Sequence, residues 1–411
     1  MKASGKHVGI VLLGITLSVL TCVSSGIRLQ AREPANIGSR EADGDIATID
    51  HLVPHISTVP ANAGEPVELF VRERVRHGDG DGRANERHHR RPIVLMVHGS
   101  TQSTVVSFDL PFENYSWMAF LARAGFDVFA LDQTGYGFSP RPRMDDPCNA
   151  SKAQQEALLI PNPLPAPCPP SYPFALTTGQ SDWDEIDTVV DYLRELRGVE
   201  KVSLVGWSLG GPRMGGYAAR HPEKVDRLVL YAPFYNRAEP NDPPGVVPDP
   251  GVPLQVRTVA SFFATWDSQV HCDNQFTPAI RDVLRSTILS FDPLGSTWGV
   301  EDLWRAPVQS THWGWNAASA ARIEAPTLLI RGDLDIQVPV EQVTSLYADL
   351  GTNQGTSKVF VHVACAAHQL VWENQHLILL GASAEWLRHG TFAGQPTGSF
   401  FVDASRHVHP E

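Results

Sequence analysis

A single serine between two glycines constrains this chain more than any other feature of its sequence. Residues 206–210 read Gly-Trp-Ser-Leu-Gly, after an apolar run at 202–205 and before a helix-compatible stretch at 212–220. This order predicts a buried strand, a tight turn and a helix, with the Ser208 side chain lifted above the end of a sheet. Glycine is needed on both sides because a Cβ in so crowded a turn would clash with the neighbouring strand or helix.

The remainder of the chain has the composition of a folded globular protein. Its 411 residues are 42% hydrophobic and 19% charged, which allows a large single domain or two smaller ones. The net charge of −12 argues against nucleic acid as a partner. The basic cluster at 83–91 is short and lies beside acidic residues, as in a solvated loop. The His88–His89 pair could bind a metal, but no further ligands accompany it, so we expect neither a metal nor another cofactor.

The N-terminus has the layout of a signal peptide. Lys2 and Lys6 precede an apolar run at 8–23, and small polar residues follow at 24–26. We therefore expect residues 1–26 to be removed and the mature protein to be secreted or periplasmic, without a stable membrane span. An uncleaved membrane anchor is the alternative, although the run is slightly short for one. Lipid attachment at Cys22 is less favoured, because Thr21 is a poor residue to precede such a cysteine.

Four cysteines remain after the signal segment, at 148, 168, 272 and 365. Export would permit disulfides. Cys148 and Cys168 bracket a proline-rich segment, so we expect them to pair, the alternative being two buried free thiols. The sequence does not choose among the three possible pairings of four cysteines.

Strand and helix patterns alternate along most of the chain. Residues 27–65 lack periodicity and predict a linker, and 391–411 predict a C-terminal tail. Strands are predicted at 66–76, 92–98, 126–131, 201–207, 225–232, 327–331 and 358–363. Helices are predicted at 114–124, 182–196, 340–350 and 369–388. Residues 140–175 are too rich in proline for long regular elements. The pattern predicts an α/β core over 66–234 and 323–390, with a mostly parallel sheet covered by helices on both faces.

One interval, from 233 to 326, breaks this alternation and is too long for a structureless loop in a compact domain. It holds half of the ten tryptophans, namely Trp266, Trp298, Trp304, Trp313 and Trp315. We predict that residues 235–322 form an inserted, mainly helical cap. Most of its aromatic side chains would make the cap's own core. A few would line an apolar substrate pocket over the serine, for which the candidates are Trp207, Phe262, Trp266 and Trp313.

A serine hydroxyl is a poor nucleophile at neutral pH and needs a base, which in turn needs a carboxylate to orient it. Asp333 and Asp335 both follow the strand predicted at 327–331. Among the later histidines, His362 falls inside a predicted strand and His376 inside a predicted helix. His368 lies in the loop between them, where an imidazole can reach back over the strand ends. Of these three histidines, His368 is therefore the best placed to act as a general base.

Taken in order, five motifs resemble the α/β-hydrolase superfamily, in its capped serine hydrolase and esterase branch, over roughly residues 66–390. They are His98-Gly99-Ser100, Asp132-x-x-Gly135-x-Gly137-x-Ser139, Gly206-x-Ser208-x-Gly210, Gly332-x-x-Asp335 and His368. The resemblance implies the chain order serine, acid, histidine, which restricts the base to the late histidines, and we therefore predict His368 as the general base. Its Gly-x-x-Asp pattern selects Asp335 as the acid and leaves Asp333 as a turn or capping residue.

The resemblance also implies an oxyanion hole made of backbone N–H groups. One N–H would come from Leu209, at the start of a helix whose dipole helps. The other would come from Ser100, with Thr101 as the alternative. We expect His98, Asp132 and the 135–139 segment to brace loops.

A serine at this position favours acyl transfer to water, because haloalkane dehalogenases and epoxide hydrolases of this fold use an aspartate there. We therefore expect a carboxylic ester hydrolase acting on a small ester with an apolar or aromatic group. A peptidase or amidase resembling proline iminopeptidase is an alternative. Its amino-group ligands would be Asp267, Asp273, Asp282 and Glu301, although solvated helix faces explain these residues equally well. A cofactor-free haloperoxidase also agrees with the motifs. A non-catalytic binding protein is disfavoured, since all three triad candidates are present. His312 could contact substrate, although a surface or core position is the simpler expectation.

Overall fold

The structure is a computed structural model that describes residues 45–76, 91–240, 245–309 and 312–411. The predicted signal peptide and the His88–His89 pair lie outside these ranges. No helix within them is long and apolar enough to cross a membrane.

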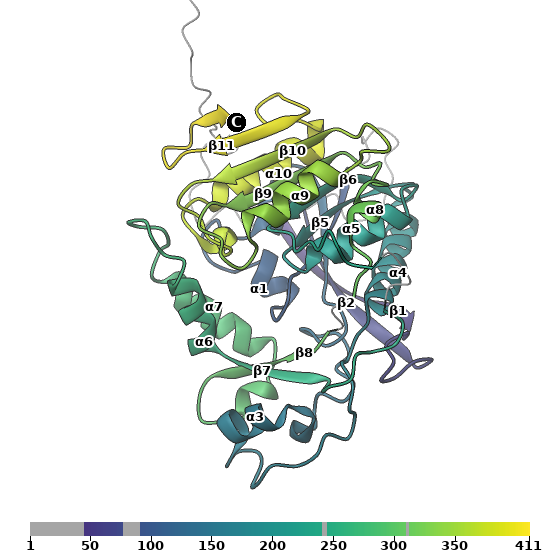
Figure 1. Cartoon of the computed structure of the whole chain (residues 1–411), viewed down its shortest axis with the longest axis vertical. Helices are drawn as coiled ribbons and strands as arrows, with labels where there is room; N and C mark the ends of the chain where they lie inside the picture. Colours follow the sequence, from purple (N-terminus) through teal and green to yellow (C-terminus); the bar gives the residue numbers. More distant parts are fainter. Residues whose placement is uncertain (1–44, 77–90, 241–244, 310–311) are drawn as a thin grey trace, which may run out of the picture.

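A central sheet organises the described residues (Figure 1). Ten strands follow the order β1-β2-β4-β3-β5-β6-β9-β10-β11-β12 among the described residues. Their bounds are β1 Ile46–Ile56, β2 Pro66–Arg76, β3 Ile93–Val97, β4 Asp127–Leu131, β5 Val202–Trp207, β6 Val225–Tyr231, β9 Thr327–Gly332, β10 Lys358–Val363, β11 Gly398–Val402 and β12 Val408–Pro410. The strands from β4 to β11 in this order are parallel, and β1, β2 and β12 pair antiparallel at the two edges. The predicted mostly parallel sheet is confirmed.

Helices cover both faces of this sheet and explain its continuous apolar runs. Every residue of β3 is buried, since alternate side chains enter two separate hydrophobic clusters. One cluster includes α2 (Trp117–Arg123) and α10 (His376–His389). The other includes α4 (Gly179–Arg197), α5 (Gly210–Arg220), α8 (Ala317–Ala320) and α9 (Val340–Asp349).

The edges of the sheet differ from the sequence analysis. Part of the predicted 27–65 linker is β1, which pairs with β2 along its whole length. Part of the predicted 391–411 tail forms β11 and β12. These predictions were wrong because few residues of these outer strands are buried and their apolar residues do not alternate with polar ones. In β1, Leu52 is 57% and Ile56 59% exposed, so no alternating pattern marks the strand.

The 235–322 segment contains strands as well as helices. Besides the short η3 (Gly295–Thr297) and α8, which packs in the core, its helices are α6 (Val259–Asp267) and α7 (Ile280–Ser290). Its strands β7 (Leu254–Thr258) and β8 (Leu303–Pro307) form a separate antiparallel pair. Figure 1 shows these four elements grouped at one end of the molecule, opposite β10 and β11. The expectation of a mainly helical insertion missed this pair, because each of its strands is only five residues long.

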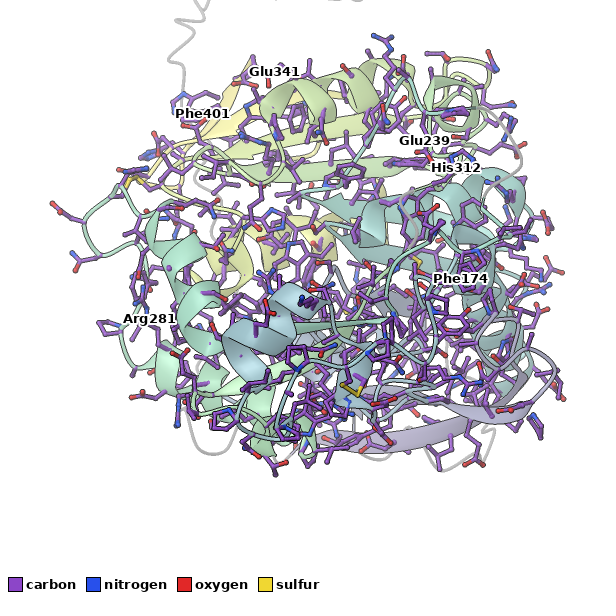
Figure 2. The ribbon with its side chains drawn as sticks, turned by 60° about the horizontal axis from the view of Figure 1, so that its bottom comes forward. Phe174, Glu239, Arg281, His312, Glu341 and Phe401 are labelled. Atoms are coloured by element: carbon purple, nitrogen blue, oxygen red, sulfur yellow. A yellow bond between two sulfur atoms is a disulfide. The ribbon has the colours of Figure 1, made fainter. Side chains whose placement is uncertain are left out.

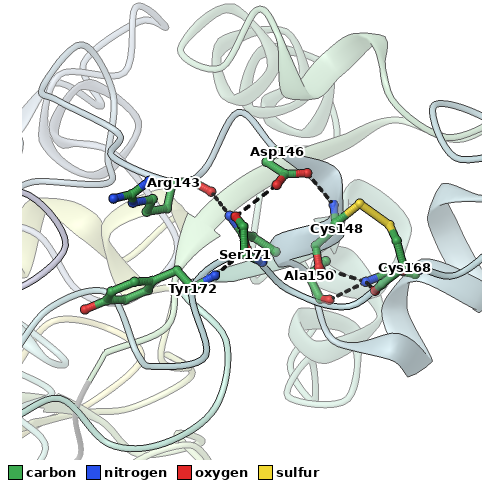
Figure 3. The surroundings of a disulfide bond; sticks show 9 residues. Arg143, Asp146, Cys148, Ala150, Cys168, Ser171 and Tyr172 are labelled. Carbon is green, nitrogen blue, oxygen red and sulfur yellow. Dashed lines mark hydrogen bonds between the residues drawn. A yellow bond between two sulfur atoms is a disulfide. The ribbon is translucent and has the colours of Figure 1, made fainter.

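The proline-rich segment packs against the insertion. It forms the short helices η1 (Pro147–Asn149), α3 (Lys152–Gln154) and η2 (Gln155–Leu159). Its apolar side chains share a hydrophobic cluster with Leu254 and Val256 of β7. The predicted Cys148–Cys168 disulfide is confirmed, with an S–S distance of 2.08 Å (Figure 3).

Candidate active site

Ser208 stands at the turn between β5 and α5. Its φ of 55° lies in the left-handed region, which residues other than glycine rarely adopt. The Ser208 N–H donates to the Tyr231 carbonyl at 2.9 Å, which ties the turn to the end of β6. A Cβ on Gly206 would collide with the Gly210 carbonyl, and one on Gly210 would lie 2.5 Å from the Val97 carbonyl oxygen. The two flanking glycines are therefore steric requirements of the turn.

His368 and Asp335 form a hydrogen-bonded pair. The distance from His368 Nδ1 to Asp335 Oδ2 is 2.8 Å, and the two residues are only 5% and 2% exposed. The second carboxylate oxygen of Asp335 accepts from the N–H groups of Gln337 and Val338 at 2.8 and 2.9 Å. Because a carboxylate only accepts, Nδ1 of His368 is the donor in this hydrogen bond, and Nε2 is the ring nitrogen not engaged with Asp335. Asp333 is exposed and takes no part in this pair.

Ser208 and His368 line the same cavity, whose volume is about 280 Å³. The loop after β3 reaches this cavity through Ser100. It approaches Ser208 so closely that a Cβ on Gly99 would lie 3.0 Å from the Ser208 Cβ. Lining residues come from both the core and the insertion: Gly99, Ser100, Thr101, Gln102, Trp207, Ser208, Gln255, Arg257, Phe262, Thr265, Gln337, His368 and Gln369.

The aromatic candidates are divided between this cavity and the core. Trp207 and Phe262 are on the lining. Trp266 lies elsewhere, with its indole N–H donating to Glu373 Oε1 at 2.8 Å. Trp313 also lies elsewhere, 5.7 Å from the guanidinium of Arg213. The lining is therefore mainly polar and not the aromatic pocket that the sequence analysis expected.

His312 also lies away from the cavity lining. Figure 2 shows it beside Glu239, and the distance from His312 Nδ1 to Glu239 Oε1 is 3.1 Å. The position of His312 therefore gives no support to the idea that it contacts substrate.

The predicted oxyanion donors lie beside Ser208. Leu209 directly precedes the first residue of α5, and Ser100 is on the cavity lining. Neither backbone N–H donates a hydrogen bond within the described residues, so both are available to a ligand. Thr101 has a φ of 70°, and its carbonyl accepts from the Trp304 indole at 2.7 Å. This bond ties the loop after β3 to β8.

Arg213 stabilises the loop after β3, a role that the sequence analysis did not predict. It is fully buried in α5, and its Nη1 donates to the His98 and Gly99 carbonyls at 3.0 and 3.1 Å. Its Nε donates to Asp182 at 2.8 Å, which balances the charge. The one signal in the sequence that could have indicated this role is a charged residue in the glycine-rich helix after Ser208.

His98 and Asp132 brace loops, as expected. Burial and the nearby Arg213 lower the pKa of His98 to about 3, so its imidazole is neutral at pH 7. The Asp132 carboxylate accepts from the N–H groups of Thr104 and Phe138 at 2.7 and 3.2 Å. These bonds connect the loops after β3 and β4.

Two buried side chains connect the insertion to the loops that carry Asp335 and His368. Gln269 is 0% exposed, and its Oε1 accepts from the N–H groups of Ile336 and His368 at 3.2 and 3.4 Å. Glu373 accepts from the Ala367 N–H at 2.7 Å and also receives the Trp266 bond. Burial raises the pKa of Glu373 to about 7.

A second disulfide makes the same connection covalently. Cys272 of the insertion is bonded to Cys365, three residues before His368. The sequence could not assign this pair, because the two cysteines lie 93 residues apart.

The parallel sheet, the serine at the strand-to-helix turn and the His–Asp pair after later strands together define a class of hydrolase. The sequence matches the α/β hydrolase fold family over residues 92–375, and the chain belongs to this family. Of the described residues, no group of three or more His, Cys, Asp or Glu is placed to hold a metal ion.

Individual relatives are distant or match only in part. The poly(3-hydroxyalkanoate) polymerase subunit PhaC of Allochromatium vinosum is 54% identical over 44 residues, which are 11% of this chain and 12% of that protein. The solved structure of CarC, a serine hydrolase involved in carbazole degradation, is 14% identical and has a TM-score of 0.48, covering 83% of this chain and 99% of its own. The monoacylglycerol lipase of Paleococcus ferrophilus is 21% identical and has a TM-score of 0.45, covering 79% of this chain and 100% of its own.

Proposed function

We propose that this α/β hydrolase cleaves carboxylic esters through an acyl-enzyme. Ser208 is the nucleophile, His368 the general base and Asp335 the residue that orients it. One observation carries the proposal: the 2.8 Å His368–Asp335 hydrogen bond adjoins the cavity that Ser208 and His368 both line. The family supports hydrolysis as the reaction class.

The proposed reaction has two halves. His368 Nε2 takes the proton of Ser208 as the hydroxyl oxygen attacks the ester carbonyl carbon. Negative charge then develops on the carbonyl oxygen, where the N–H groups of Leu209 and Ser100 can stabilise it. Asp335 stabilises the imidazolium, which returns the proton to the leaving alcohol. A water activated by His368 then releases the acid and regenerates Ser208.

Ester chemistry is favoured over an aminopeptidase reaction by the charges around the cavity. Asp267, Asp273, Asp282 and Glu301, which could have held a substrate amino group, are all exposed and none lines the cavity. Asp267 instead pairs with Arg281, which lies at the outer edge of the insertion (Figure 2). Hydrolysis rates of an aminoacyl arylamide and the matching ester test this preference directly.

We also propose that the protein is exported and acts in an oxidising compartment. The signal-peptide layout of residues 1–26 and the two disulfides support this location. N-terminal sequencing of the protein from culture medium or periplasm is the test. A cytosolic protein that retains Met1 would contradict export.

Substitution of each triad candidate tests the mechanism. We expect Ser208→Ala and His368→Ala to lower kcat on 4-nitrophenyl acetate by about 10⁴-fold or more. Wild type should react with a fluorophosphonate, whereas neither of these two variants should. Asp333→Asn is the matched control for Asp335→Asn, because it changes an exposed carboxylate in the same loop. Wild-type turnover by Ser208→Ala would refute the proposal.

A further inference from the structure

We infer that Arg257 recognises an anionic group of the substrate, and that the preferred ester carries a carboxylate. This inference rests on the proposed ester-hydrolase function and specifies its substrate class.

The alternation of β7 places Arg257 at the cavity. Leu254, Val256 and Thr258 are buried, while Gln255 and Arg257 are half-buried and lie on the cavity lining. Because successive side chains of a strand point to opposite faces, Gln255 and Arg257 share the face turned to the cavity. Leu254 and Val256 pack on the other side, against the proline-rich segment.

The position of Arg257 is defined relative to the reaction centre. Arg257 is the register partner of Trp304 in β8. The Trp304 indole donates to the Thr101 carbonyl at 2.7 Å, in the loop that carries the predicted oxyanion donor Ser100. β7 is therefore connected to that loop through one strand pair and one hydrogen bond.

Among the residues that the structure describes, the charge of Arg257 has no partner. Its Nε is buried without a hydrogen bond. Burial lowers the pKa of its guanidinium, and no acidic group in the described ranges raises this pKa in compensation. Arg305 makes an internal comparison, since it lies in β8 on the opposite face. Arg305 is bonded to Asp292 and Asp145, each at 2.6 Å. A buried charge is costly unless it is paired, so an unpaired arginine at a cavity is an expected binding site for an anion.

The other lining residues suit the same ligand. Apart from His368, Arg257 is the one ionisable group among the lining residues of this described cavity. Gln102 also lies on the lining, and its side-chain amide nitrogen is buried without a hydrogen-bond partner. A carboxylate offers two acceptor oxygens in the geometry that a guanidinium fork matches. Trp207 and Phe262 remain available for an apolar part of the same substrate.

Matched pairs of charged and neutral esters test the inference. On the acyl side the pair is mono-4-nitrophenyl adipate and its methyl ester. On the alcohol side the pair is 4-acetoxybenzoate and its methyl ester. We expect wild type to prefer the charged member of at least one pair by about tenfold or more in kcat/KM, after subtraction of the enzyme-free rate. Arg257→Gln should lower that preference at least tenfold, and Arg257→Lys should retain part of it.

Arg285→Gln is the control, because Arg285 is an exposed arginine of the same insertion, paired with Asp302. We expect this variant to keep the wild-type preference. Thermal unfolding of Arg257→Gln and Arg257→Lys shows whether each variant is folded.

A second readout does not depend on turnover. Benzoate and phenyl phosphate are compared for protection of Ser208 against a fluorophosphonate. We expect benzoate to protect wild type and to protect folded Arg257→Gln at least tenfold less well. Stronger protection by phenyl phosphate would overturn the assignment of a carboxylate.

The outcomes separate the inference from the function on which it rests. If both esters of each pair are hydrolysed equally well and Arg257→Gln leaves the ratio unchanged, the inference fails and the ester hydrolase stands. If no ester is hydrolysed and Ser208 does not react with the fluorophosphonate, the proposed function itself fails.

Discussion

The Cys272–Cys365 disulfide should contribute to both stability and catalysis, and a paired experiment separates these effects. Changing both cysteines to alanine opens a loop whose ends lie 93 residues apart. The chain-entropy relation gives a loss of about 4.6 kcal/mol in the free energy of unfolding. The same relation gives about 3.3 kcal/mol for Cys148–Cys168, whose ends lie 20 residues apart.

The two disulfides should differ more clearly in catalysis. Cys365 lies three residues before His368, whereas Cys148–Cys168 closes the proline-rich segment. Gln269 still holds the His368 N–H in the first double variant, so we expect a partial loss of kcat of about tenfold, or ~1.4 kcal/mol in activation free energy. The second double variant should keep a kcat within about twofold of wild type.

Urea unfolding, monitored by circular dichroism, gives the free energies of unfolding. Steady-state hydrolysis of 4-nitrophenyl acetate, under conditions where the variants are folded, gives kcat. Equal kcat values for the two double variants would refute a role for the disulfide in positioning His368. A smaller stability loss for Cys272/Cys365 than for Cys148/Cys168 would refute the loop-entropy argument.

Three further predictions concern single residues. Gln269→Met should cost ~1–2 kcal/mol of stability and lower kcat more than it changes KM, because it leaves the His368 N–H without an acceptor. Urea unfolding measures the stability, and steady-state kinetics measure kcat and KM. Burial raises the pKa of Glu373 from 4.5 to about 7, so the folded state binds the proton more tightly than the unfolded state. The free energy of unfolding of wild type should therefore fall by about 3 kcal/mol as the pH rises from 4.5 through 7. Urea unfolding at pH 5 and pH 8 should show this loss in wild type and not in Glu373→Gln. Gly210→Ala should destabilise the protein by ~3 kcal/mol, since its Cβ would lie 2.5 Å from the Val97 carbonyl oxygen; an unchanged thermal midpoint would contradict this.

The substrate pocket shows where reasoning from sequence stopped. Aromatic content predicted an aromatic lining, yet Trp266 and Trp313 are buried elsewhere and the lining is mainly polar. The residue that now specifies a substrate class, Arg257, lies in a strand of five residues. So short a segment does not reveal which of its faces is turned to the serine, because that depends on how the insertion packs.

Local features of the sequence determined the core of the fold. The apolar runs predicted β3, β5, β6, β9 and β10, because a strand buried on both faces must be apolar throughout. The glycines around Ser208 predicted the turn, since steric exclusion acts over a few residues. Edge strands such as β1 carry neither constraint and were missed.

Only the tertiary structure decided what surrounds the serine. It brought His368 to 2.8 Å from Asp335 and placed Gln269 between the loops that carry them. It also left Arg257 without a carboxylate partner in the part of the chain that the structure describes. The sequence could predict His368 and Asp335, because each follows a recognisable strand. It could not predict the roles of Gln269 and Arg257, because these roles come from contacts between segments that are distant in the chain, such as Gln269 with His368 and β7 with β8. No local pattern records such contacts.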